Sequence, residues 1–283
     1  MNKIKSYWSL IKSLQTILLL VTGVAGFISA RCPVMNFGIF AGLVSSLFLT
    51  VGGTTVLNMV YDKDIDSKMK RTILRPLPSG KISKRNALMF GMIILISGLV
   101  ISYFMSKLYF IIMFAGFFID FVIYTIWLKR KSAWSILWGG ISGGMPILAG
   151  RALGIGEIDL IGLMLSLSIL LWIPTHILTF NIRHFKDYKN AKIPTFPSKY
   201  GFNKTRIIIA LSSIGAALAV IIGTMALGLS WGYIRLIIIL ALGSILLGTY
   251  SIIKPSEKVN FGLFKYASIF MLSTMILIVI ATI

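Results

Sequence analysis

The fold is decided by residues 36–66, which read NFGIFAGLVSSLFLTVGGTTVLNMVYDKDID. The part up to Leu57 is long and apolar enough to cross a bilayer as a helix. It runs into three carboxylates, although the chain of 283 residues has only eight acidic residues and a formal net charge of +20. Asn58, Asp62 and Asp66 are spaced four residues apart, so on a helix they line one face. Like charges stacked in this way favour a bound hard cation with oxygen ligands, such as Mg²⁺.

Composition indicates that this apolar helix is one of many. Apolar residues make up 57% of the chain, charged residues make up 13%, and the mean hydropathy is +0.91. These values are typical of a polytopic membrane protein. Strong basicity often indicates a nucleic-acid partner, but here no soluble basic domain carries the charge, so we expect no nucleic acid. The single cysteine, Cys32, excludes an intrachain disulfide and a cysteine metal cluster.

Nine apolar segments are long enough to span a membrane, and lipid requires each of them to be helical. They cover residues 13–30, 36–57, 86–106, 108–128, 135–153, 159–181, 205–229, 232–253 and 262–282. We therefore expect one all-α transmembrane domain over residues 1–283, built from nine helices.

The distribution of basic residues predicts how these helices are oriented. Of the 28 Lys and Arg residues, 24 lie at the N-terminus or around the connections after the second, fourth, sixth and eighth segments. The positive-inside rule assigns these connections to the cytoplasm, with the N-terminus inside and the C-terminus outside a cell membrane. The two longest cytoplasmic connections, about 58–85 and 182–204, are the expected place of the functional site.

In the first long loop, a run of cations follows the carboxylates. Lys63 lies among the acids, and Arg71 and Arg75 precede the stiff turn Pro76-Leu-Pro-Ser-Gly80. This order suits a metal diphosphate, because Asp oxygens hold Mg²⁺ while Lys and Arg neutralise the remaining phosphate charge. A solvated loop with Asp–Lys pairs is the alternative interpretation, and the regular spacing of the acids argues against it.

The second long loop and the segment before it contain both histidines of the chain. His176 follows the helix-perturbing Pro174 inside a membrane segment, where a histidine indicates either a functional role or a hydrogen-bonded packing residue. His184 lies in the loop, where simple solvation is the alternative. Asp187 is an isolated acid, which an ion pair with a neighbouring cation would also explain.

Polar residues also interrupt the fourth segment. Asp120 precedes Lys129 by about two turns, and Tyr124 follows Asp120 by one turn. A carboxylate inside a membrane is costly, so we expect Asp120 to have a partner, a proton or a cavity, with a structural role as the alternative. In the fifth segment, the stretch Trp138-Gly-Gly-Ile-Ser-Gly-Gly-Met-Pro146 predicts close helix packing, and a backbone that makes room for a large ligand is the alternative.

Five stretches of the chain resemble the UbiA-type intramembrane prenyltransferase superfamily. They are Leu18–Gly26, Asp62–Asp66 continuing into Arg75–Gly80, Tyr124–Arg130, Trp172–His176, and Asp187-Tyr188 with Ile193-Pro194. The resemblance implies a bundle of nine membrane helices with two cytoplasmic Asp-rich motifs, and Asn58-x-x-x-Asp62-x-x-x-Asp66 fits the first motif.

The chain departs from the superfamily pattern at three places, one of which is Ala191-Lys192 in place of Ala-Gly before Ile193-Pro194. The second motif has His184 and Tyr188 at the usual aspartate positions, which leaves Asp187 as the acid for a second metal. The sequence Lys12-Ser13-Leu14 stands where the superfamily often has Lys-Pro-Arg, so one expected cation is missing there.

Within the superfamily, the chain is most similar to the branch that modifies haem. This similarity implies farnesyl transfer from farnesyl diphosphate to the vinyl group of protohaem (haem B), a substrate rather than a cofactor, to give haem O. The implied catalytic metal ligands are Asn58, Asp62 and Asp66. The implied diphosphate-binding residues are Lys63, Arg71, Arg75 and Lys129.

On the acceptor side, the similarity implies haem contacts from His176, His184 and Tyr188. It also implies a haem A synthase or an oxidase-assembly protein as a candidate partner. The alternatives are a UbiA-type enzyme that acts on a quinone-precursor ring or a lipid alcohol, and a membrane transporter.

Overall fold

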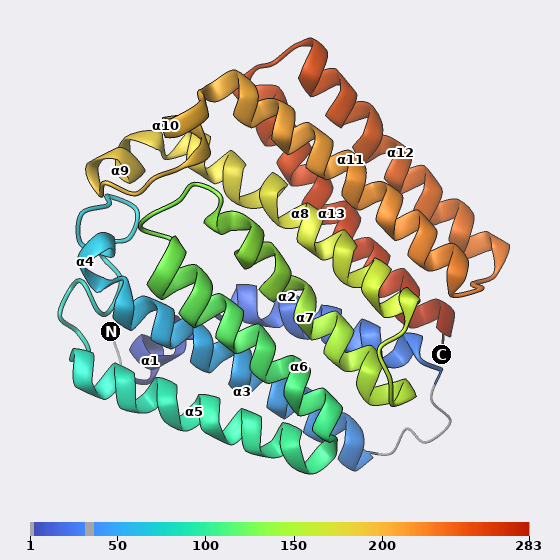
Figure 1. Cartoon of the computed structure of the whole chain (residues 1–283), viewed down its shortest axis with the longest axis horizontal. Coiled ribbons are helices and arrows are strands. Elements are labelled where there is room, and N and C mark those ends of the chain that lie inside the picture. The colour runs from blue at the N-terminus through green and yellow to red at the C-terminus, as the bar shows by residue number, and fades with distance from the viewer. Residues whose placement is uncertain (1–2, 32–36, 283) are drawn as a thin grey trace.

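The computed structural model describes residues 3–31 and 37–282, which fold into a bundle of helices (Figure 1). Cys32 and the first residue of the predicted segment 36–57 lie outside the described residues. The long helices are α2 (Ser13–Ser29), α3 (Phe37–Tyr61), α5 (Lys84–Met105), α6 (Lys107–Phe117), α7 (Ser135–Ile155), α8 (Leu160–Arg183), α11 (Phe202–Ala226), α12 (Trp231–Ile253) and α13 (Glu257–Thr282). The short helices are α1 (Lys3–Leu10), α4 (Lys63–Asp66), α9 (Phe185–Asn190) and α10 (Phe196–Tyr200). A π-helix, η1 (Phe118–Leu128), continues α6.

Each of the nine predicted segments coincides with a helix, but fewer than nine helices have the length and hydropathy of a membrane span. Within the described residues, seven helices have both properties. An eighth span results if α1 and α2, which meet at a 49° bend, are counted together. The predicted segment that does not qualify is α7, whose sequence is rich in glycine.

The low hydropathy of α7 follows from its place inside the bundle, where it packs against α2, α6, η1 and α8. A Cβ added at Gly150 would collide with the carbonyl oxygen of Gly23 on α2. A Cβ added at Gly144 would collide with Ser166 on α8. Because small residues let the helix backbones touch, α7 is covered by protein instead of lipid. The close packing predicted for the glycine-rich stretch is therefore confirmed.

The two predicted functional loops meet at one end of the bundle. Figure 1 shows α4, α9 and α10 at the end where the N-terminus lies, opposite the C-terminus. Ile65 and Met69, from the first loop, are buried against Ala191 and Ile193 from the second loop, and Tyr188 packs on the same cluster. Burial of these apolar side chains holds the charged parts of both loops next to each other.

The opposite end of the bundle is tied together by one buried cation. Arg151, on α7, donates from Nη1 to the carbonyl oxygen of Ser29 on α2 at 2.8 Å. Its Nη2 donates to Oδ2 of Asp159 at 2.6 Å, and Asp159 also accepts a hydrogen bond from the backbone N–H of Gly162 at 2.8 Å. The Asp159 carboxylate therefore caps α8 and pairs with Arg151 at the same time.

Candidate functional site

The first motif keeps its four-residue spacing although its helix does not run straight through. The backbone N–H of Asp62 donates to the carbonyl oxygen of Asn58 at 2.9 Å, and that of Asp66 donates to Asp62 at 2.8 Å. Between these bonds, α3 ends at Tyr61 and Asp62 takes φ −86° and ψ 8°, which lies outside the helical region. The prediction of a single continuous helical face was therefore wrong at Asp62, where the chain bends into α4.

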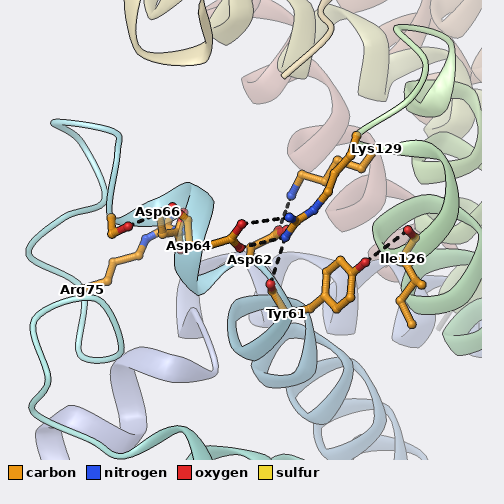
Figure 2. A network of polar contacts seen from close by, with 9 residues as sticks. Tyr61, Asp62, Asp64, Asp66, Arg75, Ile126 and Lys129 are labelled. Atoms are coloured by element: carbon orange, nitrogen blue, oxygen red, sulfur yellow. Dashed lines mark hydrogen bonds and ion pairs between the residues drawn. The ribbon is translucent and has the colours of Figure 1, made fainter. Parts of the chain in front are cut away.

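Asp62 and Asp66 are both buried, and each is paired with a cation from another segment (Figure 2). Lys129, which directly follows η1, donates a hydrogen bond from Nζ to Oδ2 of Asp62. Arg75 donates from Nη1 to Oδ2 of Asp66 at 2.8 Å. Burial alone would lower the pKa of Lys129, but the neighbouring Tyr124 and Asp62 outweigh burial and raise it. Lys129 therefore carries its positive charge beside the motif.

Asp64 is exposed and pairs with Arg130 instead. The guanidinium Nη1 and Nη2 of Arg130 each lie 2.8 Å from a carboxylate oxygen of Asp64. The same guanidinium lies 4.8 Å from the ring centre of Tyr61. These hydrogen bonds hold the pKa of Asp64 below its ordinary value. Arg130 is missing from the residues that we predicted for the site, although it follows Lys129 directly in the sequence.

Two oxygen atoms without a hydrogen-bond partner mark the place where a cation fits. Oδ1 of Asn58 and Oδ1 of Asp62 are both buried and have no hydrogen-bond partner. A buried acceptor without a partner is costly, and a hard cation such as Mg²⁺ would satisfy both atoms. Within the described residues, no three His, Cys, Asp or Glu side chains are grouped as metal ligands. The donors that fit a metal are therefore an amide oxygen and a carboxylate oxygen one helical turn apart.

Asp120 of η1 is hydrogen-bonded to Asn58 of α3. Its Oδ2 accepts a hydrogen bond from Nδ2 of Asn58 at 2.6 Å, and its Oδ1 accepts one from Oγ of Ser142 at 3.3 Å. The Asp120 carboxylate therefore has hydrogen-bond partners that offset the cost of placing it inside the membrane.

Three more side chains surround Lys129. The ring centre of Tyr124 lies 5.6 Å from its Nζ. Lys12, at the bend between α1 and α2, is close enough for its charge to act on Lys129, and Tyr188, on α9, also lies near it. Lys12 has φ 49° and ψ 59°, a left-handed conformation that is uncommon for a residue other than glycine. One cation of the superfamily pattern is absent here, but Lys12 itself lies among the charges of the site.

Aromatic rings form a ladder along α8. The ring centres of Trp172 and His176 are 5.2 Å apart, those of His176 and Phe180 are 5.2 Å apart, and those of Phe180 and His184 are 5.8 Å apart. Phe264 of α13 lies 5.0 Å from His176. Nδ1 of His176 is buried without a hydrogen-bond partner, which does not support the interpretation of His176 as a hydrogen-bonded packing residue.

A basic pocket of about 620 Å³ lies next to this ladder. Its polar lining residues are Lys70, Arg71, Arg183, His184, Lys186 and Asp187. Burial and the charge of Arg71 lower the pKa of His184, so its ring is neutral at pH 7.

The basic pocket also separates the predicted residues into groups. Arg71 and Asp187 line the pocket, whereas Asp62 and Asp66 do not. Lys63 is half-buried at the start of α4 and takes part in none of the ion pairs found among the described residues. The structure therefore brings Asn58, Asp62, Asp120 and Lys129 together, and it keeps Asp187 with the basic pocket.

Comparison with known proteins agrees with the resemblance found in the sequence motifs. The sequence profile of the UbiA prenyltransferase family matches residues 19–274. A protoheme IX farnesyltransferase of Thermofilum pendens is 39% identical over 217 residues, which cover 76% of this chain and 75% of that relative. A protoheme IX farnesyltransferase of Caldivirga maquilingensis is 33% identical over 282 residues, which cover 99% of this chain and 100% of that relative.

Solved structures share the fold at lower sequence identity. A structure from work on digeranylgeranylglyceryl phosphate synthase has a TM-score of 0.82 and 22% identity, and the match covers 100% of this chain and 99% of that one. A UbiA homolog from Archaeoglobus fulgidus bound to GPP and Mg²⁺ has a TM-score of 0.73 and 15% identity, with 97% and 99% covered. The chain therefore belongs to the UbiA prenyltransferase family.

Proposed function

We propose that this protein transfers the farnesyl group of farnesyl diphosphate to the vinyl group of protohaem and so makes haem O. The observation that carries the proposal is the similarity to relatives named protoheme IX farnesyltransferase, one of which is 33% identical over 99% of the chain. The site supports the donor half of the reaction, because it combines buried carboxylates with cations at the end of a membrane bundle.

Asn58, Asp62 and Asp66 would hold Mg²⁺, and Asp187 is the proposed ligand of a second ion. The Oδ1 atoms of Asn58 and Asp62, which have no hydrogen-bond partner, support this assignment, and a UbiA homolog from Archaeoglobus fulgidus was solved with GPP and Mg²⁺. When bound, Mg²⁺ would draw electrons toward the departing diphosphate. A hard divalent cation also agrees with the oxygen donors of these side chains.

Lys63, Arg71, Arg75 and Lys129 are the proposed partners of the diphosphate. Arg75 forms an ion pair with Asp66, and Lys129 forms one with Asp62. Both cations therefore lie close enough to bind an anion that enters the motif. We propose that these two cations turn from the carboxylates to the phosphate oxygens when the substrate binds. Their charge then stabilises the diphosphate as it leaves.

The reaction breaks the bond between C1 of the farnesyl group and the diphosphate oxygen, and the diphosphate departs with the electron pair. The vinyl π electrons of protohaem then form a new bond to C1, which leaves a carbocation on the carbon next to the porphyrin ring. Water adds to that carbon and loses a proton, which gives a hydroxyethylfarnesyl group. The apolar interior of the membrane bundle would protect the first cation from premature attack by water.

Haem is proposed to lie along the aromatic ladder of α8. Its flat apolar ring suits the stacked rings around His176, and its two propionates suit the basic pocket beside His184. Tyr188 directly follows Asp187 of that pocket and is close enough to influence Lys129, so it is the third proposed haem contact. If His176 contacts the haem, His176→Ala will weaken haem binding, and unchanged haem affinity would refute this role.

We also propose that α7 is a ninth span, which places the loops 58–85 and 182–204 on the cytoplasmic side of the plasma membrane. The 21 residues of α7 and its packing between α2 and α8 support this assignment. The charge distribution supports the orientation. Because the farnesyl tail keeps the product in the lipid, a haem A synthase or an oxidase-assembly protein in the same membrane is the proposed recipient.

The proposal is tested by incubating the purified chain with haem, farnesyl diphosphate and Mg²⁺ and measuring the mass of the haem product. We expect farnesylated haem from the wild type and none from Asp62→Ala or after chelation of the metal. Product from a quinone-precursor ring or a lipid alcohol, with haem unchanged, would instead support another acceptor. If farnesyl diphosphate releases no diphosphate under any of these conditions, the chain is not a prenyltransferase and a transporter becomes the better interpretation.

A further inference from the structure

We propose that Asp120 is a positioning residue that turns the side-chain amide of Asn58 so that its oxygen, and not its nitrogen, faces the metal. This inference rests on the metal site proposed above. It assigns a role to an intramembrane carboxylate that would otherwise only add a cost to the fold.

The hydrogen bonds around Asn58 fix the direction of its amide. The two ends of an amide have nearly the same shape, so only their hydrogen-bond partners decide which end faces the site. Oδ2 of Asp120 accepts from Nδ2 of Asn58 at 2.6 Å, and a carboxylate oxygen cannot accept from Oδ1. Oδ1 of Asn58 is left buried without a partner, as is Oδ1 of Asp62. With no acceptor at position 120, the amide is free to turn and present its NH₂ group to a cation, which repels it.

The π-helix explains how one segment reaches the motif at two points. Asp120 lies in the first turn of η1 and contacts Asn58, whereas Lys129 follows η1 and contacts Asp62. In an α-helix, two residues nine positions apart point about 180° away from each other. In a π-helix, with about 4.4 residues per turn, they point in nearly the same direction. The hydrogen bond from the N–H of Lys129 to the carbonyl oxygen of Tyr124, at 2.8 Å, continues this register to the end of the segment.

Ser142 holds Asp120 from the other side and suggests a conservative variant. The single Oγ proton of Ser142 is shared between the carbonyl oxygen of Gly139, at 2.9 Å, and Oδ1 of Asp120, at 3.3 Å, and the shorter contact is the one to Gly139. The Oγ lone pairs are therefore able to accept a hydrogen bond. In Asp120→Asn, the new amide oxygen accepts from Asn58 while the new NH₂ donates to Ser142, so the orientation of Asn58 is kept although the charge is lost.

The test measures Mn²⁺ binding to the full chain in lipid nanodiscs by electron paramagnetic resonance. We expect Asp120→Ala to weaken Mn²⁺ binding about 10- to 100-fold, as found for residues that orient metal ligands. We expect Asp120→Asn to retain affinity to within about threefold. Glu157→Gln removes an exposed carboxylate beyond the far end of α7 and is the matched control, with unchanged affinity expected.

A double-mutant cycle separates positioning from a structural role. If Asp120 acts through Asn58, then Asp120→Ala in an Asn58→Ala background costs no further Mn²⁺ affinity. Equal losses from Asp120→Asn and Asp120→Ala, or additive losses in the cycle, would overturn the inference. Should Asp120→Ala fail to fold, the double variant Asp120→Asn with Ser142→Ala removes the hydrogen bond between residues 120 and 142 and serves in its place. Retained Mn²⁺ affinity in this double variant would show that Asp120 has only a structural role. A loss of affinity that disappears in an Asn58→Ala background would support positioning.

The Mn²⁺ affinities of these variants do not depend on which acceptor the enzyme uses. Wild-type protein that binds Mn²⁺ with the expected dependence on Asp120, yet leaves haem unmodified, would refute the proposed function and support the inference. Protein that farnesylates haem, and whose Mn²⁺ affinity changes less than twofold in Asp120→Ala, would refute the inference alone.

Discussion

Replacement of Lys129 by methionine should change the affinities for metal and diphosphate in opposite directions. Nζ of Lys129 is hydrogen-bonded to Oδ2 of Asp62, and the two side chains are only 23% and 8% exposed. In the proposed site this cation would compete with Mg²⁺ for the carboxylate, and it would also supply charge for the diphosphate. Arg130 cannot take its place, because Asp64 holds Arg130 with two hydrogen bonds and its Nη2 is 4.0 Å from Asp62.

The size of the effect follows from the ion pair. Unit charges in contact interact with about 1–4 kcal/mol at an effective dielectric constant between those of water and a protein surface. Partial exposure of Lys129 favours the lower half of that range, about 1–2 kcal/mol. This corresponds to about a tenfold change in affinity. We therefore expect Lys129→Met to bind Mg²⁺ alone about tenfold more tightly, and to bind pyrophosphate in the presence of Mg²⁺ about tenfold more weakly.

Isothermal titration calorimetry of the full chain in nanodiscs measures both affinities, first with MgCl₂ alone and then with pyrophosphate at saturating Mg²⁺. Lys107→Met is the matched control, because Lys107 is an exposed lysine at the start of α6, remote from the motif. Both of its affinities should equal those of the wild type. Unchanged or weaker binding of Mg²⁺ alone to Lys129→Met would show that the lysine does not compete with the metal.

Three further predictions concern residues outside the metal ligands. Asp64→Asn should reduce farnesyl transfer less than about fivefold and leave Mg²⁺ affinity unchanged, because an exposed ion pair contributes about 0–1 kcal/mol; a loss as large as that of Asp62→Ala would contradict this. Burial and Arg71 lower the pKa of His184, so the unfolded chain takes up a proton first as the pH falls below about 6.5 and native stability decreases. Unfolding midpoints measured from pH 8 to 5 should fall less steeply for His184→Gln than for the wild type, and equal slopes would refute the assignment. Arg151→Met should destabilise the fold by about 3–5 kcal/mol, because it leaves a partly buried carboxylate unpaired, while transfer per folded molecule stays the same; denaturant titration and the mass assay give the two values.

The sequence was sufficient for features that depend on local spacing. The apolar segments coincide with helices because lipid leaves no other choice for the backbone. The spacing of Asn58, Asp62 and Asp66 survives the bend at Asp62, since backbone hydrogen bonds continue across it. The resemblance of the motifs to the UbiA family was confirmed by the family match over residues 19–274.

Features that depend on distant parts of the chain were not predictable in the same way. Arg130 pairs with Asp64 across 66 positions of sequence, and the packing of η1 against α3 decides which of the neighbouring basic residues reaches this carboxylate. By length and hydropathy α7 is not counted among the spans of the described residues, because its glycines, which allow close contact with α2 and α8, lower its hydropathy. The π-helix left no sign in the sequence, since residues 118–128 are as apolar as an ordinary membrane helix.

That π-helix makes the site sensitive to chain length as well as to residue type. Its hydrogen-bonded rings hold one residue more than those of an α-helix, so deleting a single apolar residue between Asp120 and Lys129 would allow an α-helix to form without changing either of them. The two side chains would then point about 80° apart instead of in nearly the same direction, so Asp120 and Lys129 could no longer reach Asn58 and Asp62 together. Such a deletion would leave every functional residue in place and would change only the number of residues between Asp120 and Lys129.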